Sequence, residues 1–248
     1  MDKTKRVKMT FAAKQPSNRP PIIFIAGFGG HSSMYKKLEN TVLGARYDLI
    51  LLNLPGFGAP ILTEKTTLNS LADFVAKKAR EIGAQIVVAH SVASIIASLA
   101  ARMPDCPLST ILSLEGNITS EDAYFSGTAA NYADPIIFKT DFLKRLDEMA
   151  SSNSIIKKYR QEIEEADPIA LWQLGRDTAD FSSKYVPGEI LASAADVIYF
   201  YNPENCPDST LKWLQENPMK RVVLNSTSHW PSIDQPDLLA NEIIRIIS

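Results

Sequence analysis

A serine with small neighbours stands at an abrupt change from a strand pattern to a helix pattern. The segment from Ile86 to Ala93 reads IVVAHSVA, and it places Ser91 between Ala89 and Ala93. A turn this sharp crowds the neighbouring backbone, so only small side chains fit two residues before and after the serine. The pattern predicts an exposed nucleophilic hydroxyl, with the amide of Val92 beside it at a helix N-terminus. A serine that merely caps the helix is the alternative.

A glycine-rich loop follows the first apolar run of the chain. It reads GFGGH from Gly27 to His31. When a serine attacks a carbonyl, the oxygen becomes negative and needs hydrogen-bond donors. We expect the amides of Phe28 and Val92 to be this oxyanion-binding pair, with Gly27 and His31 beside the substrate. A dinucleotide-binding loop is the alternative, but Ser32 stands in the G-x-G-x-x-G spacing and no acidic residue ends the next strand.

A histidine lies where it can activate the serine. A serine hydroxyl is a poor nucleophile until a base accepts its proton. Of the three histidines, His229 follows the last apolar run, in the segment NSTSHWP. A loop at the C-terminal edge of the predicted sheet can reach Ser91. We expect His31 and His90 to line the pocket with Trp230, and the ring of His90 to point away from the serine.

Six apolar runs alternate with helical patterns and must position these residues. Continuous apolar runs are typical of parallel strands buried on both faces. The runs are PIIFIA (21–26), DLILLN (48–53), AQIVVA (84–89), TILSLE (110–115), DVIYFY (196–201) and KRVVLN (220–225). Helices are expected at 68–82, at 92–103 and from Pro236 onward, the last with Asp234 as its cap. An edge strand is expected at 7–11. This alternation predicts an α/β fold with a mostly parallel sheet.

The stretch 118–192 breaks the alternation because it shows no strand pattern. Helical pieces are expected at 141–150, 154–165 and 167–177. About 75 residues are too many for a simple connection between two strands. We therefore expect a helical cap at 118–192, inserted into a core formed by residues 1–117 and 193–248.

The expected cap carries aromatic and charged residues of two kinds. Its aromatic side chains either line an acyl pocket or form a small core of their own; they are Tyr124, Phe125, Tyr132, Phe138, Trp172 and Phe181. Its charge runs, including Glu162, Glu164 and Glu165, are expected on a solvated helix face.

Taken in order along the chain, these motifs resemble the α/β-hydrolase superfamily. The order is the glycine-rich loop, NLPGFG at 53–58, the serine turn, the helical insertion and then His229. Asn53 stands where the family motif D-x-P-G-x-G has Asp, and alanines replace both glycines of G-x-S-x-G. The resemblance covers nearly the whole chain. It implies an eight-stranded, mostly parallel sheet with a serine, an acid and a histidine in that order, although part of the N-terminal hairpin is expected to be missing.

The acid departs from the commoner pattern of the family. Its usual position follows the penultimate core strand and falls near Asn205, which is neutral. We favour Glu115, because a carboxylate that ends a buried run needs a partner, and the imidazole of His229 would be one. Some haloalkane-dehalogenase-like members of the superfamily resemble this arrangement. Glu204 and Asp208 are the alternatives for the acid, and a capping role is the alternative for Glu115.

Composition narrows the classes of function. The chain has 248 residues, a net charge of −2 and 45% hydrophobic residues, as ordinary globular proteins do. Near-neutral charge disfavours a general nucleic-acid binder. No apolar run reaches the roughly 18 residues of a membrane span, and no signal-peptide pattern follows the basic start. Two cysteines, Cys106 and Cys206, predict a cytoplasmic location. No ligand cluster is apparent, so neither a metal nor a cofactor is expected.

Together these features predict a carboxylesterase-like serine hydrolase. It would cleave a small ester, thioester or lactone through an acyl-enzyme intermediate. A C–C bond hydrolase or a lyase on the same scaffold is one alternative, and a non-catalytic ligand-binding protein is another. The expected partner is a small acyl substrate rather than nucleic acid or a membrane, and assembly into a homodimer is left open.

Overall fold

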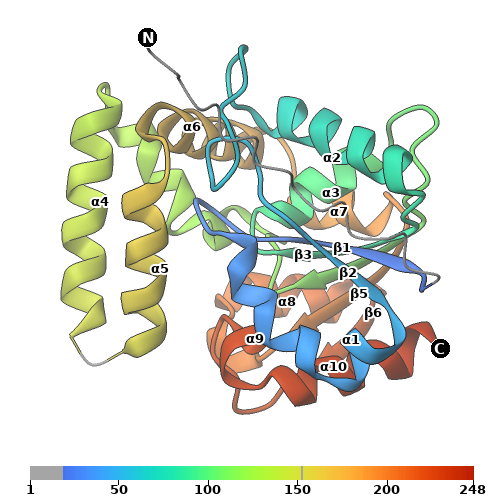
Figure 1. Ribbon diagram of the computed structural model, residues 1–248. Coiled ribbons are helices and arrows are strands. Elements are labelled where there is room, and N and C mark those ends of the chain that lie inside the picture. The colour runs from blue at the N-terminus through green and yellow to red at the C-terminus, as the bar shows by residue number, and fades with distance from the viewer. Residues whose placement is uncertain (1–18, 152) are drawn as a thin grey trace, which may run out of the picture.

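A parallel sheet forms the centre of the molecule. The computed structural model describes residues 19–151 and 153–248 (Figure 1). Within them the sheet has six strands in the order β2-β1-β3-β4-β5-β6, and every neighbouring pair is parallel. The strands are β1 (Pro21–Ile25), β2 (Asp48–Leu52), β3 (Ile86–His90), β4 (Thr110–Leu114), β5 (Asp196–Tyr201) and β6 (Lys220–Val223). The expected α/β fold is confirmed, with six strands in the described part rather than eight. The strand expected at 7–11 lies outside the described residues.

Helices cover both faces of the sheet, which explains the continuous apolar runs. One face carries α2 (Leu68–Ile82), α3 (Ala93–Ala101) and α7 (Pro187–Ala192) (Figure 1). The other carries α1 (Val42–Arg46), α8 (Asp208–Glu216), α9 (Pro231–Asp234), α10 (Pro236–Ile247) and the 3₁₀ helix η1 (Ser32–Asn40). The bounds of α2 are those expected from the sequence. Strand β1, which lies between β2 and β3, is fully buried from Ile22 to Ile25, so it anchors the loop that follows it.

The strand register brings the loops of interest to one edge. Ile25 of β1 pairs with Ala89 of β3, and Leu114 of β4 pairs with both His90 and Phe200. The carboxyl ends of these strands therefore lie side by side. In open α/β sheets this edge is where ligands bind.

The start of α10 corrects one expectation. The helix begins at Pro236, but its N-cap is Gln235, and no side chain caps it. Asp234 instead ends α9, and its Oδ2 accepts a hydrogen bond of 2.6 Å from the amide of Ser228. The carboxylate therefore fixes the loop that carries His229.

The segment 118–192 contains helices and turns but no strand among its described residues. Its elements before α7 are η2 (Ser120–Ala123), η3 (Ser126–Asn131), α4 (Pro135–Ala150), α5 (Ser154–Glu165) and α6 (Pro168–Lys184). Helix α4 begins earlier than expected because Asp134 caps it, accepting from the amides of Ile136 and Ile137, with a proline in the first turn. The α4–α5 pair stands beside the sheet (Figure 1). We call 118–192 the inserted segment.

None of the helices in the described residues combines the length and hydropathy that a membrane span requires.

Candidate active site

Ser91 occupies a strained turn between β3 and α3. Its φ is 53°, a left-handed conformation that costs a non-glycine residue about 1–3 kcal/mol and is common at functional sites. The turn is anchored to the end of β4, since the amide of Ser91 donates to the carbonyl of Leu114 at 3.0 Å. The N-cap of α3 is Val92, without a side-chain hydrogen bond, so Ser91 does not serve as a capping serine.

Gly27 is needed where the first loop passes the serine turn. A Cβ on Gly27 would lie 2.9 Å from Nδ1 of His90 and 3.0 Å from Cβ of Ser91. Because Cβ atoms essentially never approach so closely, only glycine allows this contact between the loop and the turn.

His229 meets the carboxylate of Glu115. The distance from Nδ1 to Oε2 is 2.6 Å, and the side chains are only 14% and 4% exposed. A carboxylate on Nδ1 favours a proton there, which leaves Nε2 free to accept another. The other oxygen, Oε1, accepts from the backbone amide of Asn202 at 3.1 Å and from Nδ2 of Asn205 at 2.7 Å. Glu115 itself has a φ of 42° at the end of β4.

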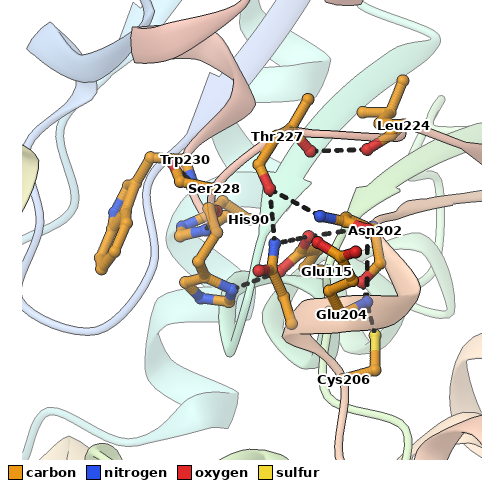
Figure 2. Close-up of polar contacts among 12 residues, drawn as sticks. His90, Glu115, Asn202, Glu204, Cys206, Leu224, Thr227, Ser228 and Trp230 are labelled. Carbon is orange, nitrogen blue, oxygen red and sulfur yellow. Dashed lines mark hydrogen bonds and ion pairs between the residues drawn. The ribbon is translucent and has the colours of Figure 1, made fainter.

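Two asparagines tie this carboxylate to the histidine loop. Nδ2 of Asn202 donates to the carbonyl of Thr227 at 2.8 Å, and Nδ2 of Asn205 donates to the same carbonyl at 3.1 Å. Figure 2 shows Thr227, Asn202 and Glu115 joined by these contacts. Oxygen acceptors and amide donors are thus matched around a buried charge.

The two alternative acids lie apart from the histidine. The backbone amide of Glu204 donates to Oδ1 of Asn202 at 3.3 Å, and Asp208 lies in the first turn of α8. Neither carboxylate forms an ion pair or hydrogen bond with His229 among the described residues, and neither lines the pocket at Ser91.

The expected oxyanion donors are backbone amides of the glycine-rich loop and of the serine turn. In the described part of the chain, the amides of Phe28 and Val92 donate to no protein acceptor. Phe28 is also held from the inserted segment, since the hydroxyl of Tyr159 donates to its carbonyl at 2.6 Å. The next residue, Gly29, has a φ of 66°, and a Cβ there would lie 2.4 Å from Ile163 of α5. The inserted segment therefore fixes the shape of this loop.

A narrow pocket joins these groups. It is lined by Ser91, His229 and the loop residues Gly27, Phe28 and Gly30. Its free volume of about 20 Å³ holds about one water molecule. The inserted segment supplies the residues of its outer side: Asp122, Tyr124, Phe125, Ser126, Tyr159 and Glu162.

Three other residues were expected at the site, and the structure brings two of them to the pocket. Trp230 and His90 line the pocket. The ring of His90 lies 4.5 Å from that of His229, and its Nε2 is 2.8 Å from the carbonyl of His229. Burial holds the pKa of His90 well below its usual value, so the ring is neutral and donates to that carbonyl. His31 is not among the described lining residues, and its Nδ1 lies 3.7 Å from Oε2 of Glu165.

The sequence-based interpretation of Glu162 was wrong. The residue was expected on a solvated helix face, yet it is 8% exposed. Its Oε2 accepts from the amide of His31 at 3.0 Å, and its Oε1 accepts from the hydroxyl of Ser33 at 3.1 Å. The available signal was its spacing, since Glu162 shares one face of α5 with Tyr159 and Ile163, which are buried.

The aromatic residues of the inserted segment are divided between the pocket at Ser91 and the packing behind it. Tyr124 and Phe125 line the pocket. Phe138 lies behind them and stacks on Phe142, with ring centroids 5.7 Å apart. In the part of the chain that the structure describes, no group of three His, Cys, Asp or Glu side chains is arranged to hold a metal ion.

The sequence profile described as the alpha/beta hydrolase family matches residues 22–242. The chain belongs to this family. A search of curated protein sequences gives no significant match.

Solved structures share the fold of this α/β-hydrolase at low identity. An esterase from Thermogutta terrifontis has 18% identity and a TM-score of 0.70, covering 92% of this chain and 89% of that one. An esterase from Exiguobacterium antarcticum has 12% identity and a TM-score of 0.71, covering 92% and 91%. The structure of 1H-3-hydroxy-4-oxoquinoline 2,4-dioxygenase has 12% identity and a TM-score of 0.73, covering 93% of each chain. At these identities the likeness concerns the fold alone.

Proposed function

We propose that this α/β-hydrolase is a serine hydrolase of the carboxylesterase type, in which Ser91, His229 and Glu115 form the catalytic triad. The observation that carries the proposal is the 2.6 Å contact between His229 and Glu115, in a site where Ser91 stands on a strained turn. A buried carboxylate on Nδ1 stabilises the imidazolium that forms when Nε2 accepts the serine proton.

The proposed reaction has two halves. His229 accepts the proton of Ser91 while Oγ bonds to the carbonyl carbon of the substrate, and the resulting oxyanion accepts hydrogen bonds from the amides of Phe28 and Val92. Collapse expels an alcohol or thiol, which takes the proton from His229 and leaves an acyl group on Ser91. Water, deprotonated by His229, then attacks this acyl group, and Ser91 leaves with the proton.

We further propose a small ester, thioester or lactone as the substrate. The narrow pocket favours a compact acyl group, and two of the structurally similar proteins are named as esterases. A C–C bond hydrolase or a lyase would use the same residues, and the similarity to a dioxygenase underlines that the fold does not choose the reaction. A cytoplasmic location, suggested by two cysteines that are unpaired in the structure, belongs to the same proposal and is checked by cell fractionation.

Ser91→Ala tests the proposal. The purified protein should react with a fluorophosphonate probe and hydrolyse p-nitrophenyl acetate, and the variant should lose both properties. Its unfolding free energy should change by less than about 1 kcal/mol, because one half-buried hydroxyl is removed. Ser33→Ala, which removes a hydroxyl near the site, is the matched control and should keep labelling. Absence of labelling and turnover in the parent protein would favour a non-catalytic ligand-binding protein.

A further inference from the structure

The described residues that line the pocket at Ser91 include two carboxylates and no lysine or arginine. The carboxylates are those of Asp122 and Glu162. Neither carboxylate forms an ion pair among the described residues. The proposed mechanism uses neither of them.

Asp122 is held by donors on one side only. Its Oδ2 accepts from the amides of Ile118 and Thr119, at 2.9 and 2.8 Å, and from the hydroxyl of Thr210 at 2.7 Å. Its Oδ1 has no hydrogen-bond partner in the described residues, and this oxygen is not fully buried. Burial raises the pKa of Asp122 because desolvation outweighs these hydrogen bonds. The carboxylate of this lining residue is therefore fixed in place and keeps one oxygen without a hydrogen-bond donor among the described residues.

Among the described residues that line the pocket, no other titratable group supplies a positive charge that would compensate these carboxylates. Glu162 accepts only from a backbone amide and a hydroxyl, both neutral. His90 stays neutral because burial lowers its pKa, and His229 is paired with a carboxylate of its own, Glu115. Arg145 contacts two lining residues: its guanidinium lies 5.2 Å from the ring centroid of Phe125, and its Nη1 donates to the carbonyl of Tyr124 at 3.4 Å. Arg145 does not itself line the pocket.

We infer that this pocket selects substrates by charge: it accepts uncharged and cationic esters and excludes esters that carry an anionic group near the scissile carbonyl. The inference rests on the proposed esterase function and narrows its substrate class. Like charges in a partly buried site repel strongly, enough for a difference of about tenfold or more in kcat/KM. Three aromatic residues, Tyr124, Tyr159 and Trp230, also line the pocket, and aromatic rings attract positive charge through their faces.

Three aryl acetates of similar shape test the inference. They are 4-acetoxybenzoate, its uncharged methyl ester and 4-(trimethylammonio)phenyl acetate, compared at about pH 8, where carboxylates are ionised. Because the carboxylate withdraws electrons least and so makes its phenol the poorest leaving group, each kcat/KM is divided by the rate constant for alkaline hydrolysis of the same ester. We expect this normalised kcat/KM for the anionic ester to be at least about tenfold below that for the uncharged one, with the cationic ester equal to or above it. Equal values for all three esters would overturn the inference.

Asp122→Asn assigns the effect to a residue. The amide oxygen can keep the bonds from Ile118 and Thr119, while the charge is lost. The ratio of kcat/KM between the uncharged and anionic esters should fall by at least about threefold. Glu121→Gln is the matched control, because it removes the same charge from the neighbouring exposed position, where Glu121 accepts from Ser209. A ratio that falls equally in both variants would contradict a role for the pocket.

A binding experiment separates this inference from the proposed function. Calorimetry with Ser91→Ala would measure the binding of 4-acetamidobenzoate, its methyl ester and 4-acetamido-N,N,N-trimethylanilinium, none of which requires turnover. Binding of the uncharged and cationic compounds without the anion supports charge selection even if the parent protein cleaves no ester. Equal binding of the anion, or no binding of the other two, would overturn it.

Discussion

Nδ2 of Asn205 donates a 2.7 Å hydrogen bond to Oε1 of Glu115, although the two residues are 90 positions apart. By spacing along the sequence, the usual position of the family's acid is expected on or near Asn205, and here the amide of Asn205 supports the acid that we propose from another strand. An aspartate at that position would put two carboxylates in contact. The neutral residue at 205 and the carboxylate at 115 are thus two parts of one arrangement.

Glu115→Gln should lower kcat by up to about 10⁴-fold, the loss seen when the acid of a well-studied triad becomes an amide. The amide can present its NH₂ group to Nδ1 and hold the imidazole in the wrong tautomer. Steady-state kinetics with p-nitrophenyl acetate measure the loss. Glu204→Gln and Asp208→Asn are the controls, and a comparable loss in either would move the assignment of the acid away from Glu115.

Asn205→Asp should impair activity more than Asn205→Ala does. Both variants lose the hydrogen bond to Glu115, but only the aspartate adds a negative charge beside it. We expect the acid limb of the pH–rate profile to move to higher pH in Asn205→Asp, because the added charge favours the protonated imidazole. In Asn205→Ala the limb should stay in place, with a loss in kcat of about tenfold or less. Identical profiles would show that the site does not sense charge at position 205.

Tyr159→Phe tests whether the inserted segment sets the oxyanion loop. The substitution removes the 2.6 Å bond to the carbonyl of Phe28 and little else. Loss of this bond loosens the loop that carries the amide N–H of Phe28, which acts on the oxyanion rather than on bound substrate. We therefore expect kcat to fall by about tenfold while KM changes little. The unfolding free energy should fall by about 1 kcal/mol. Tyr185→Phe, at an exposed position outside the pocket, is the control. A loss confined to stability would assign Tyr159 a structural role only.

His90 should make the protein less stable in mild acid. Its pKa is lowered in the folded state, so below about pH 6.5 the unfolded chain binds a proton that the folded chain does not. Stability then falls as the pH decreases through this range, by at most about 1.4 kcal/mol per pH unit from this group. Urea unfolding between about pH 7.5 and 5.5 measures the slope. In His90→Gln this part of the slope should disappear, and an unchanged slope would mean that other groups cause it.

Local patterns predicted the sheet and the turn at Ser91, because strands buried on both faces consist of short runs of apolar residues. The start of α4 and the role of Asp234 could not be predicted from the sequence, because each depends on which acidic side chain reaches a free backbone amide. Glu162 was misjudged for a longer-range reason, since its partner His31 is 131 positions away. The position of Glu115 was predictable from chemistry, because a carboxylate at the end of a buried run needs a partner. Its two asparagine donors gave no signal in the sequence.

The packing of Gly29 against Ile163, together with the bond from Tyr159 to Phe28, has a consequence for protein engineering. The inserted segment is continuous in sequence and lines the pocket, so exchanging it for that of another family member is an obvious way to change substrate specificity. Here the exchange would also remove the support of the loop that binds the oxyanion. Chimeric proteins should therefore lose turnover as well as changing selectivity, unless the glycine-rich loop is transplanted together with its matching helices.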